Sequence, residues 1–345
     1  MKQLKEQLAK LCAIPSVSGF EDAFADALQE LIAGQVDGVE RDALGNLIAC
    51  KRGSGSHPLR LLFDAHIDQI GLMITTIEEN GILRFTEIGG INLLTLYGKK
   101  VRLFGSGVRA GVIGMKPPHL STEESKKGEP IHELFIDAGF SNRREAEGRV
   151  HVGDIAVVDY YSDELLGEHY TSSGLDNKAG VLTLVTAALL LSRVEHCHDI
   201  YLLFAAQEEV GLRGARVGGF SCEPDAAVVC DVTFADPGET SITVQTGKGP
   251  VLARGPNYYP PLVSKLGDIA RREDIPVQEE IAPRPGGTDA HSLQVSRRGV
   301  YTAGVFIPLR NMHSPVEIIN VKDIYRAAKL LVFLSQEEEL LGETT

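Results

Sequence analysis

Two adjacent glutamates, Glu208 and Glu209, follow directly after the apolar segment 200–207. A carboxylate at the end of a buried strand is costly unless a cation or several hydrogen-bond donors face it. Zinc and similar divalent ions accept imidazole nitrogen and carboxylate oxygen as ligands. Short motifs elsewhere in the chain carry residues of these types, namely His66, Asp68, Asp176, Asp231 and His313. The residue types therefore indicate a metal-dependent hydrolase.

Each of these motifs has a simpler interpretation when it is taken alone. The spacing of His66 and Asp68 is common in proteins of all kinds, and Asp176 could be the N-cap of the helix that follows it. Glu208 and Glu209 are harder to explain in this way, because a strand end can direct neighbouring side chains into one cleft whereas a regular strand separates them. A pair of metal ions about 3.5 to 4 Å apart needs a bridging carboxylate and further ligands on each side. Two histidines and three acids are enough for such a pair.

The segments that must position these side chains alternate between helical and extended patterns. Apolar residues recur at helical spacing in 4–11, in 20–32 and again in 177–191, and Ser18 with Glu21 has the form of a capping box. Short apolar runs that are typical of strands precede His66, Glu208 and Asp231. Open α/β sheets place their sites at the carboxyl ends of such strands. The pattern predicts an α/β domain with its site at one edge of the sheet.

The character of the sequence changes from about Gly71, where strands alternate with glycine-rich turns and helical periodicity is scarce before the short stretch 142–146. This pattern predicts a small barrel-like β module. The polar stretch 121–130 within it is interpreted as a long mobile loop. We therefore predict one α/β domain formed by residues 1–68 and 169–345, interrupted by a β-rich insert at residues 69–168.

Composition restricts the classes of function. The chain has 345 residues, of which 43% are hydrophobic, and a formal net charge of -13. This charge would repel nucleic acid and anionic membrane surfaces. No segment approaches the roughly 20 apolar residues of a membrane span, and the first residues do not resemble a signal peptide, so we expect a cytoplasmic protein. Five scattered cysteines without Cys-x-x-Cys spacing indicate buried thiols rather than disulfides or a thiolate metal site.

The ordered motifs resemble those of the M42 metallo-aminopeptidases, also called the TET, glutamyl-aminopeptidase or deblocking-aminopeptidase family. The resemblance covers essentially the whole chain, including parts of the insert that look like the PDZ-like dimerisation domain of the family. The motifs that carry it are Ala-His-Ile-Asp, Gly-Leu-Asp-Asn-Lys, Gln-Glu-Glu-Val-Gly-Leu-Arg-Gly-Ala, Cys-Asp-Val, Gly-Gly-Thr-Asp-Ala and Met-His-Ser-Pro-Val-Glu.

The resemblance implies a ligand set for two metal ions. Asp176 would bridge them. His66 and Asp231 would complete one site, and Glu209 with His313 would complete the other. The ions would be zinc or cobalt, with manganese as a further candidate.

The resemblance also implies roles for three residues beside the ligands. Glu208 would be the general base that takes a proton from the water between the metals and returns it to the leaving amine. Asp68 would accept the other ring N–H of His66 and so fix its tautomer. Gln69 stands where glutamate is frequent in the family, and a neutral amide there is expected to play a polar supporting role.

The implied fold is a mixed-sheet zinc-peptidase domain with helices on both faces, interrupted by the small PDZ-like β barrel. The implied function is removal of N-terminal residues from short peptides by a homo-oligomer, in which dimers assemble into a tetrahedral dodecamer. Arg284 and Arg310 could bind a substrate carboxylate, which would favour acidic side chains, or could equally pair with acids at a subunit contact. The cluster His196-Cys197-His198 is interpreted as an exposed loop.

The sequence is also compatible with two other functions. The same ligands would serve a deacylase or a carboxypeptidase. The chain could also be a catalytically silent assembly or binding protein built on a peptidase scaffold, although the presence of all five ligands and Glu208 speaks against it.

Overall fold

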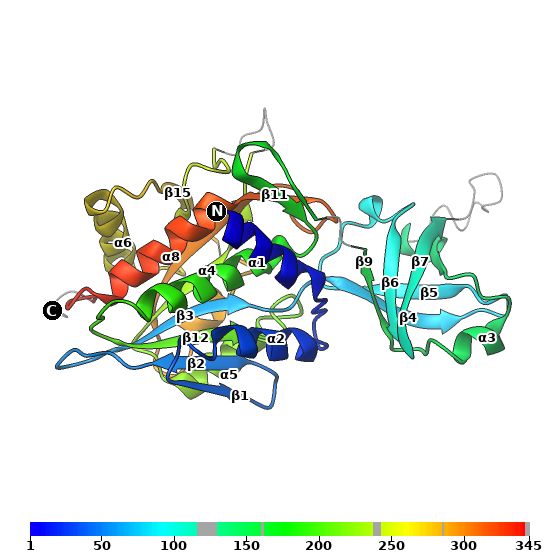
Figure 1. The fold of residues 1–345 in the computed structure, drawn as a ribbon, viewed down its shortest axis with the longest axis horizontal. Helices are drawn as coiled ribbons and strands as arrows, with labels where there is room; N and C mark the ends of the chain where they lie inside the picture. Colours follow the sequence, from blue (N-terminus) through cyan, green and yellow to red (C-terminus); the bar gives the residue numbers. More distant parts are fainter. Residues whose placement is uncertain (116–129, 160–161, 237–242, 285, 342–345) are drawn as a thin grey trace.

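The chain forms a large α/β part and a smaller β barrel in a computed structural model (Figure 1). The structure describes residues 1–115, 130–159, 162–236, 243–284 and 286–341. No helix within these ranges is long and apolar enough to cross a membrane.

An eight-stranded sheet forms the centre of the α/β part, in the order β1-β2-β12-β3-β13-β16-β14-β15. In that order the strands are Gly38–Arg41, Leu47–Lys51, Asp199–Ala205, Arg60–His66, Ala226–Phe234, Tyr301–Leu309, Val251–Arg254 and Gln278–Ile281. The four central strands, from β12 to β16, run parallel, while β2 and β14 pair antiparallel with their inner neighbours. The central strands are buried along nearly their whole length, which accounts for their almost continuous apolar sequences.

Helices cover both faces of this sheet. On one face, α4 (Leu175–Leu191) and α8 (Val321–Ser335) pack against the central strands, α1 (Lys2–Ala13) and α2 (Asp22–Ile32) against α4, and α6 (Pro260–Arg272) against α8. On the other face lie α5 (Arg213–Cys222) and α7 (Asp289–Gln294). Most of α4 is buried all round, as expected for a helix whose apolar residues are not confined to one stripe.

The barrel is a closed antiparallel structure in the order β4-β5-β8-β7-β6-β9. These strands are Gly71–Ile77, Leu83–Ile88, Leu134–Asp137, Gly107–Met115, Lys100–Gly105 and Ile155–Val158, and α3 (Arg143–Glu147) adjoins them. A hydrophobic core of its own fills the barrel. The predicted fold class, a mixed α/β domain interrupted by a small β barrel, is confirmed. Most of the stretch predicted as a mobile loop, residues 121–129, lies outside the described residues.

The two parts adjoin near the first turn after α1. Val17 forms a bridge to Gln69 and packs with Ile155 and Val157 of the barrel strand β9. A small third sheet lies on the α/β side and consists of β10 (Asp163–Glu164), β11 (His169–Ser172) and β17 (Glu317–Asn320). All five cysteines are free, three of them buried and two half-buried.

Candidate metal centre

Three neighbouring parallel strands bring side chains of the site to one edge of the sheet. His66 is the last residue of β3 and pairs with Ala205, the last residue of β12, so that Glu208 and Glu209 follow just beyond it. On the other side, Val229 of β13 pairs with Asp64 of β3, which places Asp231 level with His66. The carboxyl ends of parallel strands meet at one edge, and this geometry explains why residues far apart in the sequence converge there.

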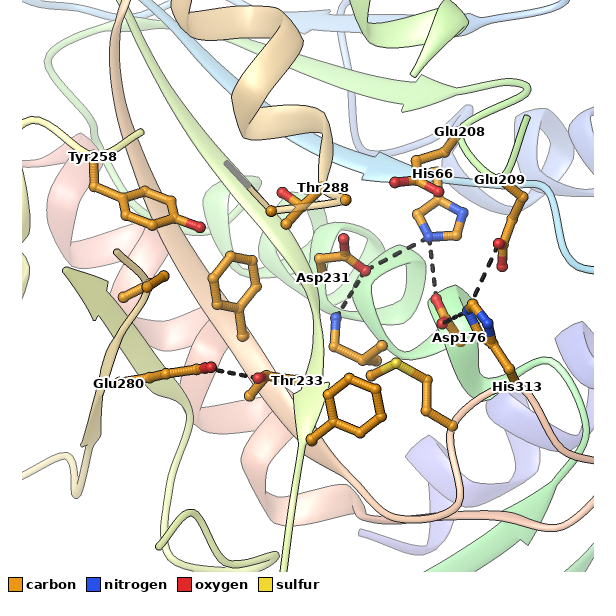
Figure 2. Close-up of a pocket in the computed structure, with 18 residues that line it drawn as sticks. His66, Asp176, Glu208, Glu209, Asp231, Thr233, Tyr258, Glu280, Thr288 and His313 are labelled. Atoms are coloured by element: carbon orange, nitrogen blue, oxygen red, sulfur yellow. Dashed lines mark hydrogen bonds and ion pairs between the residues drawn. The ribbon is translucent and has the colours of Figure 1, made fainter. Parts of the chain in front are cut away.

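Asp176 and His313 reach the same place from loops. Asp176 lies at the start of α4 with non-helical backbone angles, and its side chain caps no N–H group of the helix, so it is not the N-cap that its sequence position also allowed. Its two carboxylate oxygens face different histidines, with Oδ1 3.1 Å from His66 Nε2 and Oδ2 3.3 Å from His313 Nε2. Figure 2 shows Asp176 between the two rings.

The ligand atoms form two groups that share Asp176. One group consists of His66, Asp176 and Asp231, and the other of Asp176, Glu209 and His313, with the ligand atoms of each group within 4.8 Å of one another. These nitrogen and oxygen donors are the types that divalent transition metals prefer. The arrangement therefore fits two metal ions that share one carboxylate. All five residues that the sequence suggested as ligands are brought together.

Asp68 fastens the ends of two strands to each other. Its Oδ1 accepts a hydrogen bond from the backbone N–H of Glu208 at 2.8 Å, and its Oδ2 accepts one from the N–H of Glu209 at 3.1 Å. The hydroxyl of Ser18 also donates to Oδ2, at 2.6 Å, so Ser18 is not the capping residue that its spacing to Glu21 suggested. Asp68 thus fixes the backbone from which both glutamates extend.

The ring of His66 is oriented by the same residue. Its Nδ1 lies 3.1 Å from the backbone carbonyl oxygen of Asp68 and 3.4 Å from Oδ1 of the Asp68 carboxylate. A proton on Nδ1 is therefore stabilised, which leaves Nε2 free as a ligand atom. The tautomer is set by a carbonyl group as well as by the carboxylate.

His313 receives an equivalent contact from the loop that joins β5 to β6 of the barrel. Its Nδ1 donates to the carbonyl oxygen of Gly90 at 2.8 Å, and its Nε2 faces Asp176 and Glu209. A side chain at position 90 would begin 3.2 Å from Nδ1, and one at Gly89 would begin 3.3 Å from the Cβ of Glu209. The insert therefore contributes backbone to the site and lies in tight contact with it at both glycines.

Glu208 is 7% exposed, and its Oε1 is buried without a hydrogen-bond partner in the described part of the chain. Burial, reinforced by the charges of Asp231, Asp289 and Glu209, raises its pKa to about 10 despite the opposing effect of His66. Burial and the charge of Asp176 likewise raise the pKa of Glu209 to about 8. Without cations, this cluster of carboxyl groups favours protonated forms.

The pKa values of the two histidines are raised as well, by neighbouring carboxylates and against the effect of burial. A hydrogen bond with Asp176 raises the pKa of His313 to about 9, and the charge of Glu209 adds to the effect. Burial would lower the pKa of His66, but the surrounding carboxylates, with Glu208 foremost, raise it well above its usual value. Protons on these groups take the place that metal ions would occupy.

Two further residues support the site and were not assigned roles from the sequence. Glu317 is buried, and its carboxylate accepts the backbone N–H groups of Asp176 at 3.1 Å and His313 at 3.0 Å, so one side chain holds two ligand-bearing segments. Buried Lys178 donates to the side-chain oxygen of Gln69, and burial lowers the pKa of this lysine to about 8. In the sequence, Glu317 is the last residue of the Met-His-Ser-Pro-Val-Glu motif and Lys178 the last residue of the Gly-Leu-Asp-Asn-Lys motif, but neither motif indicates what these side chains contact.

A cavity of about 330 Å³ opens from the candidate metal ligands toward Thr233, Tyr258 and Glu280. Gly286, Gly287 and Thr288 line it, and Thr288 also caps α7 by accepting from the N–H of Ala290. Neither Arg284 nor Arg310, which the sequence offered as ligands of a substrate carboxylate, lines this cavity.

The prediction for His196-Cys197-His198 is wrong in one respect. The segment is a connection, but the side chains of His196 and His198 are 5% and 1% exposed. His198 Nε2 bonds the carbonyl of Glu337, and His196 Nδ1 bonds the carbonyl of His198. These histidines are satisfied by backbone groups of the core rather than by a metal.

An α/β sheet whose strand ends gather histidine and carboxylate side chains into two overlapping groups of candidate ligands beside a cavity is typical of metal-dependent hydrolases. The M42 glutamyl aminopeptidase family model matches residues 45–330. The chain belongs to this family and is an aminopeptidase, a hydrolase of peptide bonds.

Individual relatives are similar to this chain over nearly its whole length. The lysyl aminopeptidase of Pyrococcus furiosus is 38% identical, with 96% of both chains covered. An aminopeptidase from the archaeon Desulfurococcus kamchatkensis superimposes with a TM-score of 0.91 at 35% identity, over 97% of this chain and 95% of that one. The TET1 peptidase of Pyrococcus horikoshii, which can assemble into a tetrahedron or a large octahedral shell, gives a TM-score of 0.86 at 35% identity over 97% and 99% of the two chains.

Proposed function

We propose that this protein is a dinuclear metal-dependent aminopeptidase that removes N-terminal residues from short peptides, with Glu208 as the general base. The observation that carries the proposal is the position of Asp176, which faces both histidines and belongs to both ligand groups. A shared carboxylate is the feature that distinguishes a paired site from two separate ones.

His66 and Asp231 would hold one ion, Glu209 and His313 the other, and Asp176 both. Zinc or cobalt would suit these donors, with manganese as a further candidate. When bound, two such ions polarise the scissile carbonyl group and lower the pKa of the attacking water.

Glu208 supplies the proton transfer. It lies at the same cavity wall as the proposed ligands, and its Oε1 has no hydrogen-bond partner among the described residues. The hydrogen bond from its N–H to Asp68 fixes its backbone. In this mechanism its carboxylate takes a proton from the attacking water and then donates it to the nitrogen of the leaving amine. Asp68 has no contact with substrate in this scheme and positions Glu208 and His66.

The charge of the cavity favours an aminopeptidase over a carboxypeptidase. Among the described residues that line it, none is lysine or arginine, whereas Glu208 and Glu209 at the reacting end of the cavity are acidic. A carboxypeptidase needs a cationic group to bind the terminal carboxylate of its substrate. A peptide with a free α-ammonium group is attracted by the same acidic surroundings.

Assembly and location are further parts of the proposal. We infer a homo-oligomer of dimers forming a tetrahedral dodecamer, with residues 69–168 as the dimerisation insert and residues 1–68 and 169–345 as the catalytic domain. A related TET1 structure is a dodecamer. Leu94, Tyr97 and Val108 of the insert are 87%, 60% and 62% exposed, as expected of side chains that a subunit contact would cover. A cytoplasmic location remains an expectation from the sequence.

The test uses metal-free protein reloaded separately with zinc, cobalt and manganese. Peptides with a free amino terminus should be hydrolysed one residue at a time from that end, while the same peptides with an acetylated amino terminus should be left intact. Hydrolysis of the blocked peptides alone would identify a deacylase or carboxypeptidase. A reloaded protein that cleaves neither set would indicate the silent assembly protein instead.

A further inference from the structure

The cavity beside the metal ligands has a second acidic position at its far end. In Figure 2, Glu280 and Tyr258 lie on the side of the cavity opposite Glu209 and His313. Thr233 lies between the two ends, and its hydroxyl donates to Oε2 of Glu280 at 2.7 Å. Oε1 of Glu280 has no hydrogen-bond partner within the described ranges, so one oxygen is fixed and the other is free.

Strand geometry relates the residue that holds this carboxylate, Thr233, to the candidate metal ligand Asp231. Asp231 and Thr233 are two residues apart on β13 and therefore face the same side of the strand. Two residues of a parallel strand span about 6.6 Å. Thr233, which holds the Glu280 carboxylate, is therefore two strand residues beyond the candidate ligand Asp231, in the direction of the far end of the cavity.

Glu280 differs from its neighbour in the direction of its side chain. On β15, adjacent residues point to opposite faces, so Glu279 lies outside the cavity, where it pairs with Arg254 at 2.8 Å. Glu280 is half-buried in the cavity wall and makes no ion pair with a lysine or arginine in the described part of the chain. An acidic group without a protein cation is available to a cation of the substrate.

The wall between the two ends is apolar. Phe306, Tyr258, Ala253 and Met312 line it, and the rings of Tyr258 and Phe306 pack edge to face with their centroids 6.1 Å apart. Such a wall suits an aliphatic stem, and a carboxylate at its end suits a cationic tip. Lysine, with an ammonium group on a four-carbon stem, has both features, and so does arginine.

We propose that Glu280 selects substrates whose N-terminal residue is lysine or arginine, by pairing with the cationic end of that side chain while Thr233 holds the carboxylate in place. This proposal rests on the proposed aminopeptidase function and adds its specificity. The α-ammonium group of the substrate does not compete for Glu280, because only one carbon atom separates it from the scissile carbonyl, which must lie at the metal ligands. Glu280 therefore meets the side chain.

The experiment compares lysyl, arginyl, norleucyl and glutamyl anilides on the metal-loaded protein. Norleucine has the unbranched stem of lysine without its charge. A hydrogen bond to a charged group in a half-buried site corresponds to about a 10- to 100-fold preference, so kcat/KM for lysyl anilide should exceed that for norleucyl anilide by this factor. Glutamyl anilide should be the poorest of the four. Free lysine should inhibit more strongly than free norleucine in the same proportion.

Glu280→Gln should reduce the preference for lysine over norleucine to near one while leaving kcat/KM for norleucyl anilide close to that of the wild type. Glu279→Gln is the matched control, because it removes the same charge from the adjacent position outside the cavity, and it should leave the ratio unchanged. A wild-type ratio near one, or equal effects of the two variants, would overturn the specificity proposal. Failure of the wild type to hydrolyse any of the four anilides would instead contradict the proposed aminopeptidase function.

Discussion

Replacing Glu208 with glutamine tests the assignment of the general base directly. Glutamine keeps the shape of the side chain but cannot accept the proton of the attacking water. The backbone of residue 208 should stay in place, because its N–H bonds Asp68 irrespective of the side chain. Oε1 of Glu208 has no hydrogen-bond partner in the described structure, so the substitution breaks no existing side-chain hydrogen bond at that atom.

The expected loss follows from the value of general acid–base catalysis, typically about 10²- to 10⁴-fold in rate. This factor corresponds to about 2.7 to 5.4 kcal/mol of transition-state stabilisation. Because Glu208 is not one of the five grouped ligands, Glu208→Gln should retain both metal ions and should bind peptides with a KM near that of the wild type. Steady-state kinetics on an aminoacyl anilide, combined with metal analysis of the same sample, measure both quantities.

Glu209→Gln is the control, since it places the same change on the neighbouring residue. Glu209 belongs to the ligand group with Asp176 and His313. This variant should therefore bind less metal, while the turnover rate of those molecules that still hold both ions should fall less. Metal loss at position 208 together with a fully occupied, inactive site at position 209 would exchange the two roles. Near-normal turnover in both variants would refute the mechanism.

Three other perturbations probe the ligands and their support. Asp176→Asn should abolish activity and lower metal content at both sites, because a neutral amide cannot neutralise two cations; full activity with two metals bound would contradict the shared carboxylate. Metal binding should weaken as pH falls, because Glu209 and His313, with pKa values of about 8 and 9 in the metal-free protein, are protonated below these values and must release protons to bind. Calorimetry in buffers of different ionisation enthalpy would detect that release, and its absence at pH 7 would contradict the protonated cluster. Gly89→Ala should reduce both activity and metal content, because residue 89 has a φ of +76° and a Cβ there would lie 2.8 Å from Ile70 and 3.3 Å from the Cβ of Glu209. Gly98→Ala is the control, because residue 98 also has a positive φ but a Cβ there meets nothing within 4 Å. It measures the backbone strain alone, about 1 to 2 kcal/mol.

The convergence of His66, Glu209 and Asp231 could be anticipated from the sequence for a physical reason, whereas Asp176 and His313, which lie outside the strands, were placed only by the family resemblance. Apolar runs mark the strands, and parallel strands bring their carboxyl ends to one edge, so residues such as His66 and Asp231 meet there despite the distance between them in the chain. The interruption by a β barrel was equally visible, because glycine-rich turns and the absence of helical periodicity distinguish residues 71–115 from their surroundings.

The supporting contacts could not be anticipated, because most of them involve backbone groups. Glu317 binds two N–H groups of the ligand-bearing segments, and the carbonyl of Gly90 orients His313. Every residue has a backbone carbonyl group, and every residue except proline has an N–H group. No pattern of residue types therefore predicts these contacts. His198 was expected to be exposed because it lies in a charged stretch between a helix and a strand, but a backbone carbonyl of Glu337 satisfies its ring within the core. Ser18 was misassigned for the related reason that a hydroxyl suits a helix cap and a distant carboxylate equally well.

The contact between Gly90 and His313 changes the role expected of the barrel. A module that served assembly alone could leave the chemistry intact when subunits separate. Here its loop fixes the tautomer of a candidate metal ligand, since Nδ1 of His313 donates to the Gly90 carbonyl while Nε2 faces Asp176. A tilt of the barrel would therefore move the ring of His313 before it disturbed His66, which is held by Asp68 within the α/β part. The two halves of the metal centre should consequently differ in their sensitivity to assembly, with the Glu209 and His313 side depending on the barrel and the His66 and Asp231 side on the sheet.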